Sequence, residues 1–224
     1  PSALPETHRR IFTRQPSPET KREVARELIG NFAARAYRRP VEAAEVDRLM
    51  KLFELADKNG EAFETSVKIA LEAALVSPRF LFRGELQPNP NNPKSVHPID
   101  EYALASRLSY FLWSSMPDEE LMSLAGRGVL RKNLEAQGRR MLRNSRSKAL
   151  VENFAGQWLQ LRNLDLVNVD RKRFPAYTGE LRAAMRQETE LFFQHVMEED
   201  RSVLEFLNAD YSFVNGPLAR HYGI

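Results

Sequence analysis

The stretch GELRAAMRQETELFFQHVME, residues 179–198, decides the fold. Its apolar side chains recur every three to four residues, the spacing at which side chains share one face of an α-helix. They are Leu181, Met185, Phe192 and Val196. A helix of this length spans roughly 30 Å, because each residue adds about 1.5 Å. We therefore predict that this helix is the central element around which the second half of the chain packs.

Amphipathic periodicity also covers most of the remaining chain. No segment shows the sustained period-two alternation of a strand, so the sequence predicts an all-α fold with no sheet. We expect helices at about residues 18–37, 42–58, 61–76, 100–113, 118–125, 133–143, 148–162 and 179–198, with short helical segments at 203–207 and 217–222. Ser17, Asp100 and Asn215 stand where N-caps are expected, because their side-chain oxygens can accept the first free N–H groups of a helix.

A segment rich in proline and asparagine interrupts these helices at residues 84–98. Proline lacks the backbone N–H and restricts the residue before it, so this segment cannot hold a helix. We therefore predict a three-helix module at residues 1–83, a linker at 84–98 and a larger helical domain at 99–224.

Composition removes several classes of protein from consideration. The chain has 224 residues, no cysteine and a formal net charge of +3. Without cysteine it can form neither a disulfide scaffold nor a thiolate metal site, and it has no cysteine nucleophile. Its apolar runs fall short of the roughly 18 residues that argue for a membrane span. It starts at Pro1 without a signal-peptide pattern, and we expect it to be a piece of a longer protein.

Two polar side chains lie on the apolar stripe of the 179–198 helix. Glu188 and His195 are nearly two helical turns apart, so both face the predicted core. A buried carboxylate needs a partner. Arg107 lies among Leu104, Leu108 and Phe111, which we predict to face inward on their own helix. We predict that Arg107 and Glu188 form an ion pair in the core. The functional alternative is an acid–base pair of Glu188 and His195 in a cleft, with His221 as a further catalytic candidate.

No recognisable motif identifies an enzyme, a nucleotide site or a metal site. The Gly-x-Ser-x-Gly and Walker patterns are absent, and the four histidines fall in separate segments. We expect no metal and no cofactor within this chain, and we lean towards no enzymatic activity for it alone. Trp113 and Trp158 are candidates for stacking on a ligand. The helical spacing of Trp158 with Phe154 and Leu161, however, favours a core position for these side chains.

Basic residues dominate residues 127–148, where eight Lys and Arg residues accompany one acid. Such a region is either a solvated helix face or an anion-binding surface. Our candidates for anion binding are Arg131, Arg139, Arg140 and Arg143. Because aromatic residues do not interleave with these cations, we do not expect nucleic acid as the partner.

Several sequence motifs resemble those of two protein families, and the motifs of one family precede those of the other along the chain. The N-terminal motifs are RAYRRPV at residues 35–41 and AALVSPRFLFR at 73–83. The C-terminal motifs are RLSYFLW at 107–113, PDEEL at 117–121, ENFAGQWL at 152–159 and LARHYGI at 218–224. The first set resembles the planctomycete domain-of-unknown-function family 1595, and the second set resembles family 1592.

The resemblance implies a context more than a mechanism. Such modules sit in large exported proteins, often beside c-type cytochrome domains and carbohydrate-binding modules. The expected function is a helical scaffold or interaction module in the periplasm or outside the cell, serving redox or polysaccharide metabolism. The expected partners are other domains of the same polypeptide, a cytochrome or a polysaccharide, with haem c in neighbouring domains. An oxidoreductase or polysaccharide-active enzyme with a site near Glu188 and His195 stays open, although no catalytic residue carries over from these families.

Overall fold

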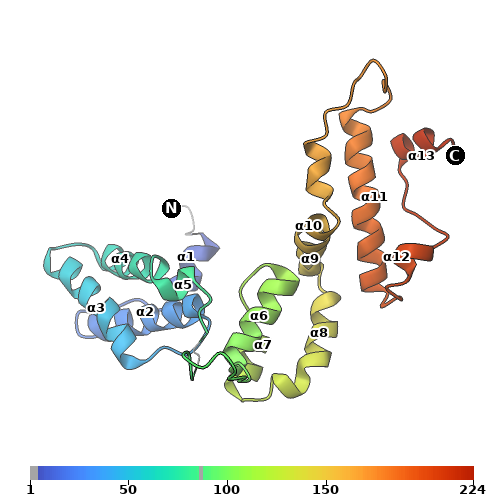
Figure 1. Ribbon diagram of the computed structural model, residues 1–224. Coiled ribbons are helices and arrows are strands. Elements are labelled where there is room, and N and C mark those ends of the chain that lie inside the picture. The colour runs from blue at the N-terminus through green and yellow to red at the C-terminus, as the bar shows by residue number, and fades with distance from the viewer. Residues whose placement is uncertain (1–4, 86–87) are drawn as a thin grey trace. The chain divides into compact units, whose positions relative to one another are not determined.

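The computed structural model describes residues 5–85 and 88–224. Within these ranges it contains helices and no strand, which confirms the predicted all-α fold (Figure 1). The chain divides into two compact units. Unit 1 comprises Pro1–Ser106 and Glu119–Val129, and unit 2 comprises Arg107–Asp118 and Leu130–Ile224.

The division between the units falls inside helix α6 (Glu101–Trp113), whereas the sequence places a linker at residues 84–98. The described part of that segment, residues 84–85 and 88–98, contains no helix, as its prolines require. Positions 86 and 87 lie outside the described residues. The domain boundaries at 83 and 99 therefore stay a prediction.

Three helices around one core form the body of unit 1. They are α2 (Lys21–Tyr37), α3 (Ala43–Lys58) and α4 (Phe63–Leu75), and each contacts the other two. The side chains buried between them include Val24, Met50, Phe53 and Val67. These are the helices that the periodicity predicts, because burying the apolar face of each one closes a single core.

Short helices and caps complete unit 1. The short helices are α1 (Glu6–Ile11), α5 (Pro78–Leu81) and α7 (Glu119–Gly126). α1 is too short for its pattern to be detected, and the sequence did not predict it. α2 begins at Lys21, three residues after the predicted start, because Ser17 caps the turn before the helix: its hydroxyl accepts the backbone N–H of Thr20.

Unit 2 is a succession of short helical segments beside one long helix, α11 (Gly179–Glu198). In order along the chain, the other segments are η1 (Arg131–Asn133), α8 (Leu134–Leu142), η2 (Ser145–Ser147), α9 (Lys148–Leu150), η3 (Val151–Ala155), α10 (Gly156–Trp158), η4 (Leu161–Asp165), α12 (Glu205–Asn208) and α13 (Gly216–Tyr222). α11 has the bounds that the sequence predicts. It contacts η3, η4 and α13, so it is the central element of the unit.

The helix predicted at residues 148–162 is interrupted. Its middle, η3, is a π-helical turn, and Gln160 has a left-handed φ of 56° that ends α10. A π turn holds more residues than an α turn, so it rotates the following side chains around the axis. Ala155 is consequently buried, whereas Phe154 and Trp158 are exposed. The expectation that Phe154 and Trp158 belong to the core is wrong.

The buried face of α6 also differs from the predicted one. Small residues form it: Ala105 and Ser109 are fully buried, together with Leu112 and Trp113. The Ser109 hydroxyl donates to the carbonyl oxygen of Ser115 at 2.9 Å, which satisfies it in the interior. Phe111, predicted to face inward, is exposed. Periodicity that counts only large apolar residues misplaces a face on which small residues pack closely.

Two predicted N-caps in the rest of the chain are confirmed. Asp100 Oδ1 accepts the backbone N–H of Ala103 at 2.8 Å at the start of α6. Asn215 Oδ1 accepts the backbone N–H of Leu218 at 3.2 Å at the start of α13. Among the described residues, none of the helices is both long enough and apolar enough to cross a membrane.

Candidate functional site

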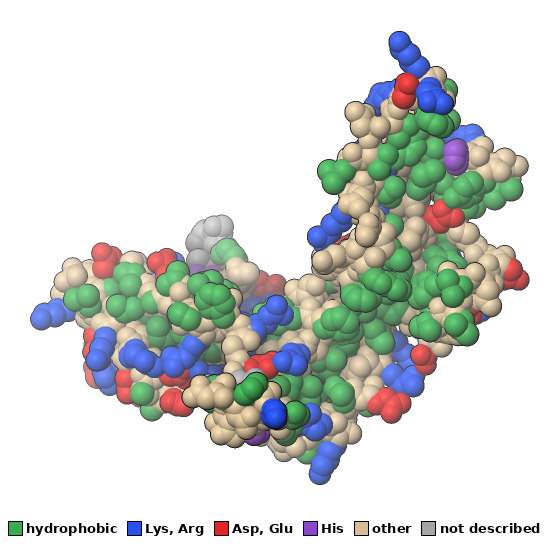
Figure 2. Space-filling model, in the orientation of Figure 1, with side chains coloured by type: hydrophobic (Ala, Val, Ile, Leu, Met, Phe, Trp, Pro, Cys, Tyr) green, Lys and Arg blue, Asp and Glu red, His purple; other side chains and the backbone are tan. Residues whose placement is uncertain are grey.

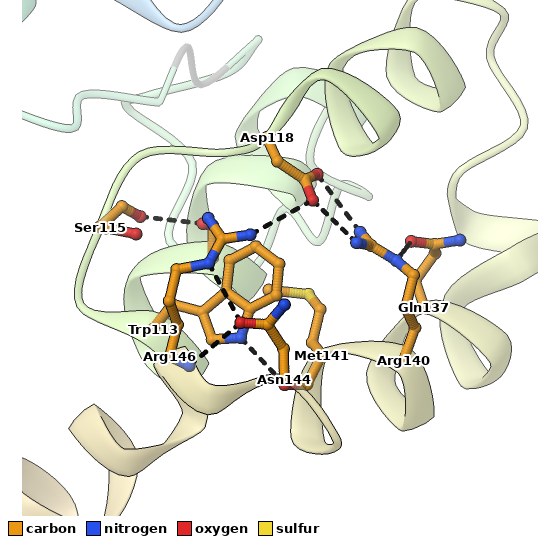
Figure 3. A network of polar contacts seen from close by, with 9 residues as sticks. Trp113, Ser115, Asp118, Gln137, Arg140, Met141, Asn144 and Arg146 are labelled. Carbon is orange, nitrogen blue, oxygen red and sulfur yellow. Dashed lines mark hydrogen bonds and ion pairs between the residues drawn. The ribbon is translucent and has the colours of Figure 1, made fainter.

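A corner of unit 2 gathers two arginines over one tryptophan (Figure 3). We call Trp113, Asp118, Arg140 and Arg146 the Trp113 corner. The indole of Trp113 is 3% exposed, and its Nε1–H donates to the carbonyl oxygen of Met141 at 2.9 Å. The guanidinium carbon of Arg146 lies 3.5 Å from the ring centroid, and that of Arg140 lies 5.5 Å away. Each such cation–π contact contributes about 0.5–2 kcal/mol.

The carboxylate of Asp118 balances these two cations. It accepts from Arg140 through both oxygens, at 2.8 and 3.2 Å, and lies 3.7 Å from a nitrogen of Arg146. Amide side chains orient the guanidinium groups further: Arg140 donates to Gln137 at 2.7 Å and Arg146 to Asn144 at 3.2 Å. The corner therefore fixes the loop after α6 to α8 and η2. We call such a set of charged side chains that links separate segments a charged joint.

A second charged joint lies in unit 1. The carboxylate of Glu45 is 3% exposed and accepts from Arg39 at 2.9 and 2.8 Å, while Arg79 Nε lies at 2.8 Å. It also accepts the backbone N–H of Glu42 at 2.9 Å, which closes the capping box of α3. The hydrogen bonds from Arg39 lead the effects that lower the pKa of Glu45 to about 2. We call Arg39, Glu45 and Arg79 the Glu45 joint.

Arg38 supports the same region through its backbone and its side chain. Its φ of 58° ends α2 in the left-handed conformation. Its guanidinium donates to the carbonyl oxygens of Arg79, Phe80 and Phe82, at 3.0, 3.4 and 3.1 Å. The sequence motifs RRP and SPRF, which carry the family resemblance, are thus in contact in the structure. Sequence reasoning assigned them no role, although Glu45 stands four residues before the buried Leu49, on the same helix face.

The predicted ion pair between Arg107 and Glu188 is not formed. Glu188 is half-buried and accepts from the hydroxyl groups of Ser212, at 2.5 Å, and Tyr222, at 2.8 Å. Arg107 is exposed, because the buried face of α6 lies on its small residues. Glu188 therefore anchors the C-terminal segment to α11, and this hydrogen bond raises the pKa of Tyr222.

The other two catalytic candidates are not brought together with Glu188 by hydrogen bonds. The ring of His195 packs against Tyr211 and Phe213, with centroids 5.4 and 5.3 Å away. His221 is exposed, with its ring 5.7 Å from that of Tyr222. The pKa of Glu205 is lowered, first by the hydrogen bond from Arg201 and then by the one from Tyr211. No acid–base pair of Glu188 and His195 is present in the described structure.

Two of the four predicted anion-binding residues contact acids of the chain itself. Arg139 bonds Asp200 at 2.8 Å and Glu135 at 3.3 Å, and Arg140 belongs to the Trp113 corner. Arg143 is exposed, and Arg131 is held by an interaction within the chain. Anion binding by this set stays a prediction. Among the residues that the structure describes, no group of three or more His, Asp or Glu side chains could hold a metal ion.

Aromatic side chains form a row on the surface of unit 2. Phe111, Phe154 and Trp158, which we call the aromatic surface, are 58%, 43% and 58% exposed. Phe111 meets Phe154 edge-on with centroids 6.0 Å apart, and Phe154 stacks on Trp158 at 5.8 Å. Phe193 and Phe206 support the row from α11 and α12, at 6.4 Å each. Trp113, in contrast, is a core residue, so its role as a ligand-stacking candidate is wrong.

The fold and these joints define an all-α protein whose polar side chains lock helices together and whose aromatic side chains are partly displayed. Comparison with family models gives the same two families as the sequence motifs. The model of the family described as Protein of unknown function (DUF1592) matches residues 99–224, more than half of the chain, and that of the family described as Protein of unknown function (DUF1595) matches residues 24–85. The chain belongs to the DUF1592 family, with a DUF1595 module before it. Searches of curated proteins and of solved structures found no match.

Proposed function

We propose that the chain is a helical interaction module of a longer, exported, cytochrome c-associated protein, and that its aromatic surface docks another domain of the same polypeptide. The export, the periplasmic or extracellular location and the haem in neighbouring domains follow from the family resemblance. The observation that carries the docking role is the exposure of Phe111, Phe154 and Trp158. Exposed aromatic groups of this size mark interaction sites more often than single exposed residues do.

The aromatic surface is held in place before any partner binds. The ring of Phe154 contacts both Phe111 and Trp158. Phe193 packs against Phe154, and Phe206 packs against Trp158. A side chain that is already ordered loses little conformational entropy on binding, so more of the contact energy appears as affinity. Aromatic residues are also enriched in the centre of protein interfaces. These properties favour a protein surface as the partner.

The contacts of the polar candidate residues favour a docking role over a catalytic one. Both carboxylate oxygens of Glu188 accept hydrogen bonds from the C-terminal segment, and the arginines of the Trp113 corner bind Asp118. These groups hold the shape of unit 2. The aromatic surface is exposed on unit 2 and is available to a partner.

The test is binding in trans between this chain and the remaining domains of its parent polypeptide, measured by calorimetry. The variant Phe111→Ser/Phe154→Ser/Trp158→Ser should bind at least a hundredfold more weakly, because each buried aromatic anchor contributes about 2 kcal/mol. The matched control replaces three exposed apolar residues of unit 1, Leu55, Val76 and Val96, with serine. Equal affinity of the folded triple variant and the wild type would contradict the proposal.

Polysaccharide binding is a second candidate, favoured by one observation. The indole of Trp158 is exposed beside the nearly parallel ring of Phe154, with an interplanar angle of 24°, a flat apolar surface that a sugar ring could cover. Trp113 is buried, so a ligand-induced change in tryptophan emission reports Trp158. Titration with oligosaccharides should change the emission of the wild type and not that of Trp158→Phe. No change in the wild type would remove this candidate.

A further inference from the structure

The loop between η4 and α11 projects from the rest of unit 2 (Figure 1). Several of its apolar side chains are exposed to solvent. We call residues 166–174 the tip loop. Leu166 is 80% exposed, Val167 48% and Phe174 56%. Every residue of the loop except Val169 is exposed. Large apolar side chains that gather on a projecting loop add little to the core and are available for an apolar contact outside the chain.

The same loop carries a run of positive charge. Arg171, Lys172 and Arg173 follow one another and are all exposed. Within the described residues, none of the three forms an ion pair with an acid of the chain. Figure 2 shows Lys and Arg side chains at the end of this loop, at the top of the view, with hydrophobic side chains beside them. Charge and apolar surface are therefore displayed together.

The base of the tip loop is held by hydrogen bonds, so its tip keeps a direction. Asp165 accepts from Arg186 at 2.7 Å, and Arg186 and Arg182 also donate to the carbonyl oxygens of Leu161 and Leu164. At the tip, Asp170 accepts the backbone N–H of Lys172 at 2.9 Å, which forms a tight turn. The three cations consequently project from one turn that neighbours Phe174.

We propose that the tip loop docks the protein on an anionic lipid bilayer surface, with Leu166 and Phe174 entering the headgroup boundary and Arg171, Lys172 and Arg173 meeting the lipid phosphates. A soluble polyanion in water would satisfy the cations and leave the apolar side chains exposed. A neutral apolar surface would leave the cations without partners. An anionic bilayer offers both environments within about 5–10 Å of depth.

The test uses the full chain and vesicles of phosphatidylcholine, alone or with about 30% phosphatidylserine, in a sedimentation assay. The wild type should sediment with the anionic vesicles and much less with the neutral ones. Each cation near such a surface contributes about fivefold to binding, so Arg171→Gln/Lys172→Gln/Arg173→Gln should weaken it on the order of a hundredfold. Leu166→Ser/Phe174→Ser should also weaken it, by about tenfold or more, because two insertions are lost.

Matched controls separate a surface effect from a loss of charge or of folding. Lys51→Gln/Lys58→Gln/Lys68→Gln removes the same charge from exposed positions of unit 1 and should leave binding within about twofold. The variant Phe174→Trp should show blue-shifted emission with anionic vesicles, as insertion requires. Circular dichroism checks that each variant is folded.

Three outcomes would overturn the proposal. The first is equal sedimentation with neutral and anionic vesicles. The second is charge-dependent binding that the Leu166→Ser/Phe174→Ser variant keeps in full and that heparin reproduces, because that would assign the loop to a soluble polyanion. The third is no sedimentation of the folded wild type at all.

Discussion

The packing of apolar side chains differs between unit 1 and unit 2. In unit 1 the helices α2, α3 and α4 close one core, and Phe53 and Tyr37 are buried in it. In unit 2 the buried residues include two small clusters, one around Phe193 and one around Leu218, and the aromatic surface stays in solvent. Unit 1 is therefore stabilised mainly by burial. In unit 2, contacts between partly exposed aromatic rings add to burial, and apolar area stays accessible to a partner.

The largest difference should appear on truncation of one aromatic residue in each unit. Phe53→Ala should destabilise unit 1 by about 4 kcal/mol, since it removes a fully buried ring that packs edge-on against Phe63. Trp158→Ala should cost unit 2 less than about 1 kcal/mol, because its ring is already exposed. Urea unfolding followed by circular dichroism measures both.

The two probes of unfolding sharpen this test. Both tryptophans lie in unit 2, so tryptophan emission follows that unit, whereas circular dichroism follows all helices. If the units unfold independently, Phe53→Ala shifts the circular dichroism transition and leaves the emission midpoint unchanged. Equal losses for Phe53→Ala and Trp158→Ala would refute the comparison.

Removal of the Glu45 carboxylate should have the next largest effect. Glu45→Ala leaves Arg39 and Arg79 without their buried acceptor and opens the capping box, at a cost of about 3 kcal/mol to unit 1. Glu72→Ala is the control at an exposed carboxylate of α4 and should cost less than about 1 kcal/mol. Urea unfolding measures the difference.

The same joint predicts a pH dependence. Because the pKa of Glu45 is lowered to about 2 in the folded chain, its contribution is present above its ordinary pKa of 4.5 and is lost as the pH falls from 4.5 to about 2. The contribution amounts to at most about 3 kcal/mol. The stability difference between wild type and Glu45→Ala should therefore shrink across that range. A difference that stays constant from pH 6 to about pH 2 would show that the carboxylate acts without its charge.

In unit 2 the corresponding joint is the Trp113 corner, with a smaller expected effect. Asp118→Ala removes the acid that balances Arg140 and Arg146, and it should destabilise unit 2 by about 2 kcal/mol, because all three side chains are partly exposed. Trp113 emission detects the change directly. Glu119→Ala, at a side chain that is 97% exposed, is the neighbouring control and should stay within about 0.5 kcal/mol of wild type.

The smallest effect is expected at the C-terminal anchor. Tyr222→Phe removes the hydroxyl group that donates to Glu188 and should cost about 1 kcal/mol. Hydrogen exchange of α13 should rise several-fold, while that of α11 stays unchanged. His221→Ala, which removes an exposed ring beside Tyr222, is the control and should leave exchange unaltered.

Periodicity and caps were sufficient to predict the helices that bury one continuous face. α11 has its predicted bounds, and Asp100 and Asn215 cap the helices assigned to them, because these signals are local in sequence. The same reasoning misplaced Phe111 and Trp158. Which face of a helix is buried depends on small residues such as Ser109 and on the π turn at η3, and neither has a hydrophobic signal.

The candidate site was less predictable than the fold, because the partners of long polar side chains depend on the three-dimensional fold and not on sequence spacing. Glu188 was correctly singled out as a carboxylate that needs partners, but they are hydroxyl groups of Ser212 and Tyr222 from the end of the chain. Arg140 was a candidate for binding an anion outside the chain, and in the structure it binds Asp118. No spacing rule links residues that far apart in sequence. For such contacts the sequence predicts only that a partner exists.

The π turn at η3 also has a consequence for how such a surface can arise. One additional residue in a helix is a single-codon insertion, and here it turns Phe154 and Trp158 outward. Deleting one residue between positions 151 and 155 would restore the α-helical phase and draw the following aromatic rings back towards the interior. An exposed apolar surface can thus be gained or lost through the insertion or deletion of one codon, without any change in the identity of the side chains that form it.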